Sequence, residues 1–153
     1  LMLAHAAAAQ GTVAVDNILG KSRAIDYRSI PAATFTHPEI SSVGMSELEA
    51  KQFSEEDGFE LGIVRSYFKA NSKALAELES DGLMKLFFRK DNGEVLGGHI
   101  YGLHAADLIQ EVANSISRRQ SVIQLSNEVH THPTLSEVVE VAYKQAANQL
   151  RKS

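Results

Sequence analysis

Residues 83–101 read LMKLFFRKDNGEVLGGHIY and contain the clearest hairpin pattern in the sequence. Leu83–Arg89 has the composition of a β-strand, and Glu94–Tyr101 returns as a second strand. Between them lies Asp91–Gly93, where asparagine and glycine tolerate the positive φ of a tight turn. The stretch therefore predicts an antiparallel hairpin. The adjacent glycines at 97 and 98 indicate a bulge or a close neighbouring backbone rather than a phosphate cradle, because the sequence contains no G-x-G-x-x-G or P-loop pattern.

The residues before the hairpin predict further strands and one helix. Ala33 and Phe35 belong to a short β-prone run, and residues 60–68 form another. Ser46 and Glu49 have the spacing of a capping box, which predicts a helix over 46–56 that Gly58 closes. Residues 71–78 are compatible with either a short helix or a turn.

The residues after the hairpin predict two amphipathic helices. Apolar residues recur at helical spacing in both, at Ala105, Leu108, Ile109, Val112 and Ile116, and then at Leu135, Val138, Val139, Ala142, Ala146 and Leu150. Residues 122–125 are a short apolar piece between them. Strands, a helix, strands and then helices in this order predict an α+β fold, with an antiparallel β-sheet covered by helices.

The amino-terminal residues predict a separate short segment. Residues 1–10 have the composition of a helix that Gly11 would end, and residues 12–30 indicate short helical or irregular elements. A helix without a start signal favours a chain cut from a longer one. We expect a boundary near Tyr27, which divides the chain into a linker region, residues 1–26, and a main domain, residues 27–153.

Composition excludes several classes of function. The net charge of −4 disfavours nucleic acid as the main partner, and no apolar run is long enough to span a bilayer. The sequence contains no cysteine, which excludes structural disulfides and thiolate metal sites within these 153 residues. Any thiol–disulfide chemistry must therefore use cysteines outside them.

Residues 130–137, HTHPTLSE, carry the chemistry that the sequence offers. A histidine five residues before a carboxylate, as His132 is before Glu137, is an arrangement that suits general acid/base catalysis. Thr134 and Glu137 also have capping-box spacing, so Glu137 could simply cap the last helix. A third interpretation is a metal site formed by His130, His132 and Glu137. A serine hydrolase is poorly supported, because no G-x-S-x-G motif is present.

The same motif resembles the closing segment of the dihydrolipoamide dehydrogenases, a family of flavin-dependent pyridine nucleotide-disulfide oxidoreductases. Further stretches resemble landmarks of that family, and they occur in the same order. They are residues 2–5, 30–44, 68–74, 97–100 and 104–109. The sequence of residues 103–107 resembles that of the plastid and cyanobacterial enzymes more than that of the mitochondrial ones.

The resemblance implies the carboxy-terminal dimerisation (interface) domain of such an enzyme. It implies a homodimer in which His132 is the base for a dihydrolipoyl thiol in the partner subunit's site, with Glu137 orienting its ring. Met2, Leu3, Ala4 and His5 would lie against the flavin. The full-length enzyme would use FAD and NAD, act on dihydrolipoyl groups of 2-oxo acid dehydrogenase complexes, and work without a membrane, in the plastid stroma or the bacterial cytoplasm.

The sequence departs from the complete family pattern. The redox cysteines and both dinucleotide-binding motifs are absent, so the chain corresponds to about the last third of the enzyme. We expect it to be inactive alone and to bind neither cofactor tightly. Two other classes stay open, a stand-alone dimerisation or docking module without catalysis and a histidine/carboxylate metal-binding domain.

Overall fold

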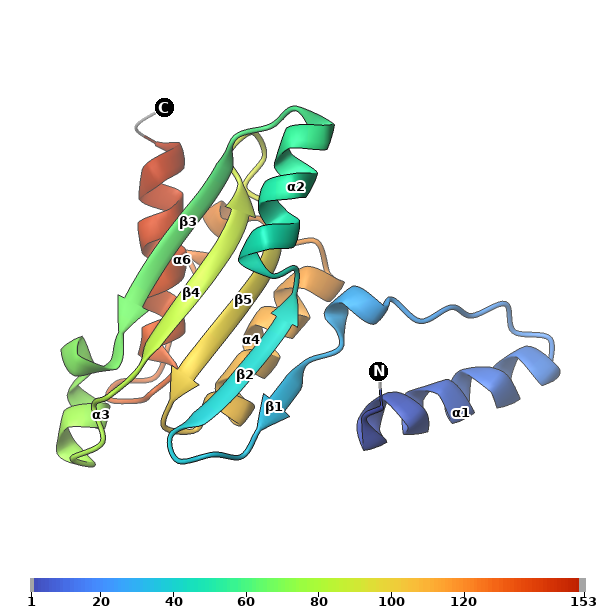
Figure 1. Cartoon of the computed structure of the whole chain (residues 1–153), viewed down its shortest axis with the longest axis horizontal. Coiled ribbons are helices and arrows are strands. Elements are labelled where there is room, and N and C mark those ends of the chain that lie inside the picture. Colours follow the sequence, from blue (N-terminus) through green and yellow to red (C-terminus); the bar gives the residue numbers. More distant parts are fainter. Residues whose placement is uncertain (1, 152–153) are drawn as a thin grey trace.

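A computed structural model describes residues 2–151 of the chain. Its centre is a five-stranded antiparallel sheet in the order β1-β2-β5-β4-β3 (Figure 1). The strands are β1 (Ala32–Thr34), β2 (Glu39–Gly44), β3 (Leu61–Tyr67), β4 (Leu83–Arg89) and β5 (Val95–Gly102). The predicted α+β fold with an antiparallel sheet covered by helices is confirmed.

The predicted hairpin forms the middle of this sheet. In β4 and β5, Leu83 pairs with Tyr101, and the turn closes where the Arg89 N–H donates to the Glu94 carbonyl (2.9 Å). Gly93 has φ +78°, as the turn requires. The register shifts between Phe87 and Phe88, which is the bulge that the paired glycines predicted.

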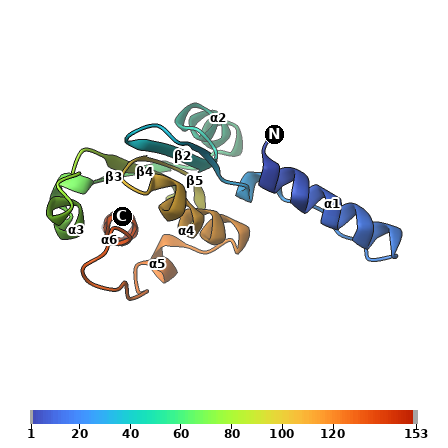
Figure 2. The same cartoon turned by 90° about the horizontal axis from the view of Figure 1, so that it is seen from below.

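Helices cover both faces of the sheet. On one face, α4 (Ala105–Ser117) packs on β2 and β5, and α6 (Glu137–Leu150) packs on β3 and β4. On the other face lies α2 (Glu47–Asp57), as Figure 2 shows. Two short helices, α3 (Ser72–Ala76) and α5 (Val122–Leu125), lie in the connections. The main core, beneath α4 and α6, includes Phe68, Leu86, Phe88, Ile109 and Tyr143.

The predicted start and end of α2 are confirmed. The Glu49 N–H donates to the Ser46 hydroxyl, and the Ser46 N–H donates to the Glu49 carboxylate, which completes the capping box. Gly58 follows the helix in the left-handed conformation, with φ +72°. A smaller apolar cluster, centred on Ala50, Phe87 and Leu96, holds this helix on the sheet.

The prediction that Gly11 ends the first helix is wrong. Helix α1 (Ala4–Ile18) continues through Gly11, and the glycine with positive φ after its end is Gly20 (φ +83°). A glycine inside an exposed helix costs only about 1 kcal/mol relative to alanine, so it does not force an end. Helix α1 lies beyond the β1 edge of the sheet in both views (Figures 1 and 2), and Ala6 is its buried residue.

One smaller expectation is also corrected, and two others gain detail. Residues 122–125, the short apolar piece, form helix α5, which Ser121 and Gln124 start with a second capping box. Phe35 falls outside β1 and is 81% exposed. The helix alternative for residues 71–78 is confirmed over Ser72–Ala76, where the Asn71 side chain accepts the Ala74 N–H.

Candidate active site

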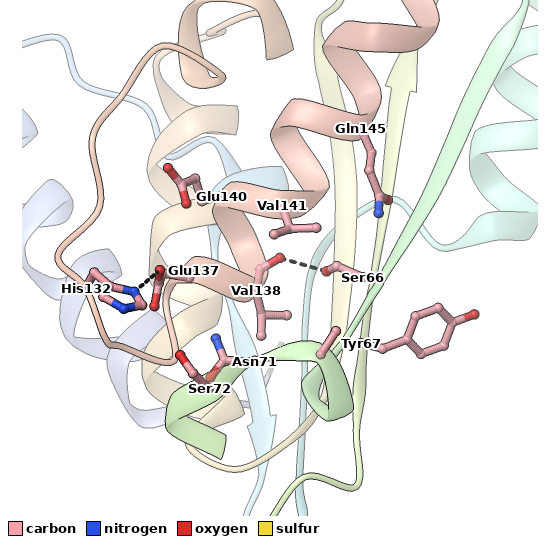
Figure 3. A pocket seen from close by; sticks show the side chains of 11 residues that line it. Ser66, Tyr67, Asn71, Ser72, His132, Glu137, Val138, Glu140, Val141 and Gln145 are labelled. Atoms are coloured by element: carbon pink, nitrogen blue, oxygen red, sulfur yellow. Dashed lines mark hydrogen bonds and ion pairs between the residues drawn. The ribbon is translucent and has the colours of Figure 1, made fainter. Parts of the chain in front are cut away.

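The structure brings together the two residues that the sequence singled out for acid/base chemistry. His132 Nδ1 lies 2.8 Å from Glu137 Oε1 (Figure 3). A carboxylate can only accept hydrogen bonds, so this contact places the ring proton on Nδ1. In the neutral ring Nε2 is then the unprotonated nitrogen, which is the form that a base needs. The His132 side chain is 72% exposed, so that nitrogen is accessible from outside the chain.

Glu137 is held by more than the histidine. Its second oxygen, Oε2, accepts the backbone N–H of Thr134 at 2.9 Å. The Thr134 hydroxyl donates to the Thr131 carbonyl instead of completing a capping box with the Glu137 N–H. The acid/base arrangement and half of the capping arrangement therefore coexist, because the two carboxylate oxygens serve different partners.

Electrostatics favour the ionised form of Glu137. The bond to His132, followed by that from the Thr134 N–H, holds the pKa of this carboxyl below its usual range. An ionised Glu137 can stabilise the positive charge that His132 would gain on taking a proton.

A cavity of about 330 Å³ lies beside the pair. Its wall comes from β3, the turn before α3, and the first turns of α6 (Figure 3). The side chains include Ser66, Tyr67, Asn71, Val138, Val141 and Gln145, so the cavity combines apolar surface with polar groups. The Ser66 hydroxyl donates to the Val138 carbonyl at 2.7 Å and fixes the start of α6 on the sheet.

The neighbouring histidine lies elsewhere. The His130 side chain is 8% exposed, and its Nε2 lies 2.9 Å from Glu111 Oε1 on α4. Burial raises the pKa of Glu111, and the bond to His130 opposes that rise. Because His130 is paired with Glu111 and His132 with Glu137, the structure does not bring the three proposed metal ligands together. Within residues 2–151, no group of three or more histidine and carboxylate residues is arranged to hold a metal ion.

The residues expected beside a flavin occupy the start of α1. Met2 is fully exposed, and Leu3 precedes the first helical residue, Ala4. The His5 ring Nε2 lies 2.8 Å from the Pro31 carbonyl. This end of the chain lies beyond the β1 edge, whereas the start of α6 lies with β3 and β4, so one chain does not bring residues 2–5 next to His132 (Figure 1).

The sequence reasoning did not assign Asn71 to the site. In the sequence, Asn71 belongs to a helix or turn signal and to residues 68–74, which resemble a family landmark. The residue is 7% exposed and lines the cavity. Neither its favourable helix-capping residue type nor the resemblance points to its partner at Thr134, 63 residues away.

Comparison with known proteins identifies the class of domain that this fold and site define. Residues 30–143 match the family described as the dimerisation domain of the pyridine nucleotide-disulphide oxidoreductases, and the chain belongs to this family. The resemblance expected from the sequence is thereby confirmed.

The similar proteins are more specific. The chain is 58% identical to the dihydrolipoyl dehydrogenase of Synechocystis over 146 residues, which are 95% of this chain and 31% of that protein. It is 53% identical to the chloroplastic dihydrolipoyl dehydrogenase 2 of Arabidopsis thaliana, over 95% of this chain and 26% of that protein. The expected likeness to cyanobacterial and plastid forms is confirmed, and the chain spans between a quarter and a third of the length of these relatives.

Solved structures agree on the fold. The crystal structure of LpdA from Mycobacterium tuberculosis superposes with a TM-score of 0.84 at 28% identity, over 95% of this chain and 31% of LpdA. The flavoprotein disulfide reductase RclA from Escherichia coli, as its Cu(II) complex, shares the fold with a TM-score of 0.83 at 21% identity, over 95% of this chain and 32% of RclA. Among the described residues, no helix is both long and apolar enough to cross a membrane.

Proposed function

We propose that the chain is the dimerisation domain of a dihydrolipoyl dehydrogenase and that His132 is the base for the dihydrolipoyl thiol. The observation that carries this proposal is the 2.8 Å contact between His132 Nδ1 and Glu137. It leaves Nε2 as the proton acceptor on an exposed ring. The similarity to dihydrolipoyl dehydrogenases supports the choice of substrate class.

The proposed step is a proton transfer that activates sulphur. His132 Nε2 takes the proton of one dihydrolipoyl thiol, and the resulting thiolate attacks a disulfide of the enzyme, forming a mixed disulfide and releasing one cysteine thiolate. A thiol is a poor nucleophile, so the base governs the rate of this step. Glu137 keeps the ring orientation and stabilises the imidazolium. The disulfide must lie outside these 153 residues, because they contain no cysteine.

The proposal places the histidine in the active site of the partner subunit of a homodimer. Two features support a shared site: the family is a dimerisation domain, and His132 faces outward. In addition, residues 2–5 and His132 do not meet within one chain. An isologous dimer would form two identical sites, each completed by the partner.

FAD and NAD belong to the full-length enzyme in this proposal. When bound, FAD would carry electrons from the reduced cysteine pair to NAD. Met2, Leu3, Ala4 and His5 fit the edge of a flavin site, because they form a largely exposed helix start whose first backbone N–H groups have no side-chain cap. Most of such a site would lie outside this chain, so we expect no tight binding of FAD or NAD by the 153 residues alone.

The wider setting follows from the same class of relatives. The substrates would be dihydrolipoyl groups of 2-oxo acid dehydrogenase complexes. With a cyanobacterial and a chloroplastic relative, we place the protein in the plastid stroma if it is eukaryotic and in the cytoplasm if it is bacterial.

The test compares two histidines in the full-length enzyme. His132→Gln should lower kcat by about 10² to 10⁴-fold, as loss of a general base does. His130→Gln should cost far less turnover, because His130 faces Glu111 rather than the cavity. A thermal melt must accompany His130→Gln, since that side chain is buried. Equal loss of turnover in two folded variants would overturn the assignment of the base.

A mixed dimer tests the sharing of the site. One subunit carries His132→Gln and the other carries a substituted redox cysteine, and each homodimer should have little turnover. The heterodimer should recover one of its two sites and therefore about half of the wild-type turnover. Failure to recover would show that His132 acts in its own subunit.

A further inference from the structure

A chain of hydrogen bonds connects α3 to the His132–Glu137 pair, and Asn71 is its first side chain. Asn71 Oδ1 accepts the Ala74 N–H at 2.9 Å, and Asn71 Nδ2 donates to the Thr134 carbonyl at 2.9 Å. One partner is a donor and the other an acceptor, so the orientation of the amide is fixed. The residue is 7% exposed, and it lines the same cavity as His132.

Thr134 links Asn71 to the His132–Glu137 pair. Its carbonyl is held by Asn71, and its N–H is held by Glu137 Oε2, whose other oxygen meets His132 Nδ1. Among the described residues, the other hydrogen bonds of residues 131–137 stay within that segment and α6. The hydrogen bond from the Asn71 amide therefore joins this segment to the turn before α3.

We propose that Asn71 is a positioning residue for the acid/base pair, an inference that rests on the proposed function of His132. Without its Nδ2 donor, the Thr134 carbonyl would lack a partner in a partly buried place and would turn toward water. That movement would carry the Thr134 N–H away from Glu137 and loosen the carboxylate that holds Nδ1. Misplacement of a reacting group by about 1 Å can cost about 10²-fold in rate.

Two replacements isolate this hydrogen bond. Asn71→Ser and Asn71→Asp both keep an oxygen that can accept the Ala74 N–H, because serine and aspartate are good N-caps. Both lose the Nδ2 donor, and they differ in charge, so a shared effect reports the lost hydrogen bond. Asn17→Ser is the matched control, since both amide atoms of Asn17 bond the backbone of Arg23 in the α1 region, away from the cavity.

The first readout is the tautomer of His132, measured by ¹⁵N NMR of the 153-residue chain at a pH where the ring is neutral. We expect about a tenfold excess of the Nδ1–H form in the wild type, held by the bond to the carboxylate. Asn71→Ser and Asn71→Asp should lower that ratio by about threefold or more, whereas Asn17→Ser should leave it unchanged. Glu137→Gln gives the tautomer ratio that His132 has when the carboxylate is absent, and it serves as the reference.

An unchanged ratio in a folded Asn71 variant, with a lowered ratio in Glu137→Gln, would overturn the proposal. Either replacement that keeps the wild-type circular dichroism spectrum suffices for this conclusion. In the full-length enzyme, Asn71→Ser should lower kcat by about tenfold with KM within about twofold of wild type. If His132→Gln left turnover intact, the proposed function would fail, and the tautomer result would still decide the positioning role.

Discussion

Gly97 is a position where any side chain would collide with backbone atoms. A Cβ built on Gly97 would lie 2.2 Å from the Met45 carbonyl oxygen and 2.7 Å from the Met45 nitrogen. Both atoms are backbone, so neither can move by rotation of a side chain. Met45 also donates its N–H to the Leu96 carbonyl at 3.0 Å, next to the bulge in β5. Gly97→Ala would therefore push apart the bulge and the segment that starts α2.

The magnitude follows from these contacts. Relief of the overlap needs a shift of about 1 Å, which overpacks the site at a cost of about 1–3 kcal/mol. The same shift weakens the Met45–Leu96 hydrogen bond, which adds about 1 kcal/mol. We expect a loss of about 3 kcal/mol in the free energy of unfolding, or about 6–12 °C in Tm.

Gly98 provides the matched control. It is the next residue of the same strand, but its Cβ would first meet Val112 Cγ1 at 3.0 Å, a side-chain atom on α4. That side chain can yield by a few tenths of an ångström, so Gly98→Ala should change the free energy of unfolding by about 1 kcal/mol or less. Urea unfolding followed by circular dichroism measures both variants. Equal losses, or a Gly97→Ala variant as stable as wild type, would refute the reasoning.

Three further measurements test other parts of the structure. Gly11→Ala places a methyl group in open space inside α1 and should raise the hydrogen-exchange protection of α1 amides about two- to fivefold; unchanged protection would count against the continuous helix. Lys51 and Lys85 lower the pKa of Glu47 from its usual 4.5 to about 2. The ionised Glu47 therefore stabilises the fold fully above pH 4.5, and this stabilisation is lost as the pH falls toward 2. The stability deficit of Glu47→Gln should therefore shrink between pH 7 and pH 3 in urea titrations, and a deficit that grows on acidification would contradict this. Light scattering of the chain over a range of concentrations should give about twice 16.7 kDa, and a persistent monomer would oppose a self-sufficient dimer interface.

Much of the fold could be predicted because its elements carry local signals. The turn at Asp91–Gly93 and the capping box at Ser46 specify backbone geometry within a few residues, and both are present in the structure. The apolar stripes of α4 and α6 also became the core, with Ile109, Val112 and Val139 fully or almost fully buried. In contrast, the prediction for Gly11 was wrong because a glycine inside an exposed helix costs only about 1 kcal/mol, so the helix continues to Ile18.

The candidate site was predictable only in part. His132 and Glu137 are five residues apart, so a turn before α6 is enough to join them. The partner of His130 was not predictable, because Glu111 is 19 residues away on another helix. The same limit applied to Asn71, whose partner at Thr134 is 63 residues distant.

Most of the elements, the antiparallel character of the sheet and the identity of the pair at the start of α6 follow from the sequence, because periodicity, capping and turn chemistry act over a few residues. Tertiary packing sets which of the two histidines in HTHPTLSE is buried against Glu111 and which faces outward with Glu137. It also sets the hydrogen bond between the Asn71 amide and the Thr134 carbonyl. These choices depend on which side chains the packed sheet and helices bring within hydrogen-bond distance, and spacing along the chain does not specify that.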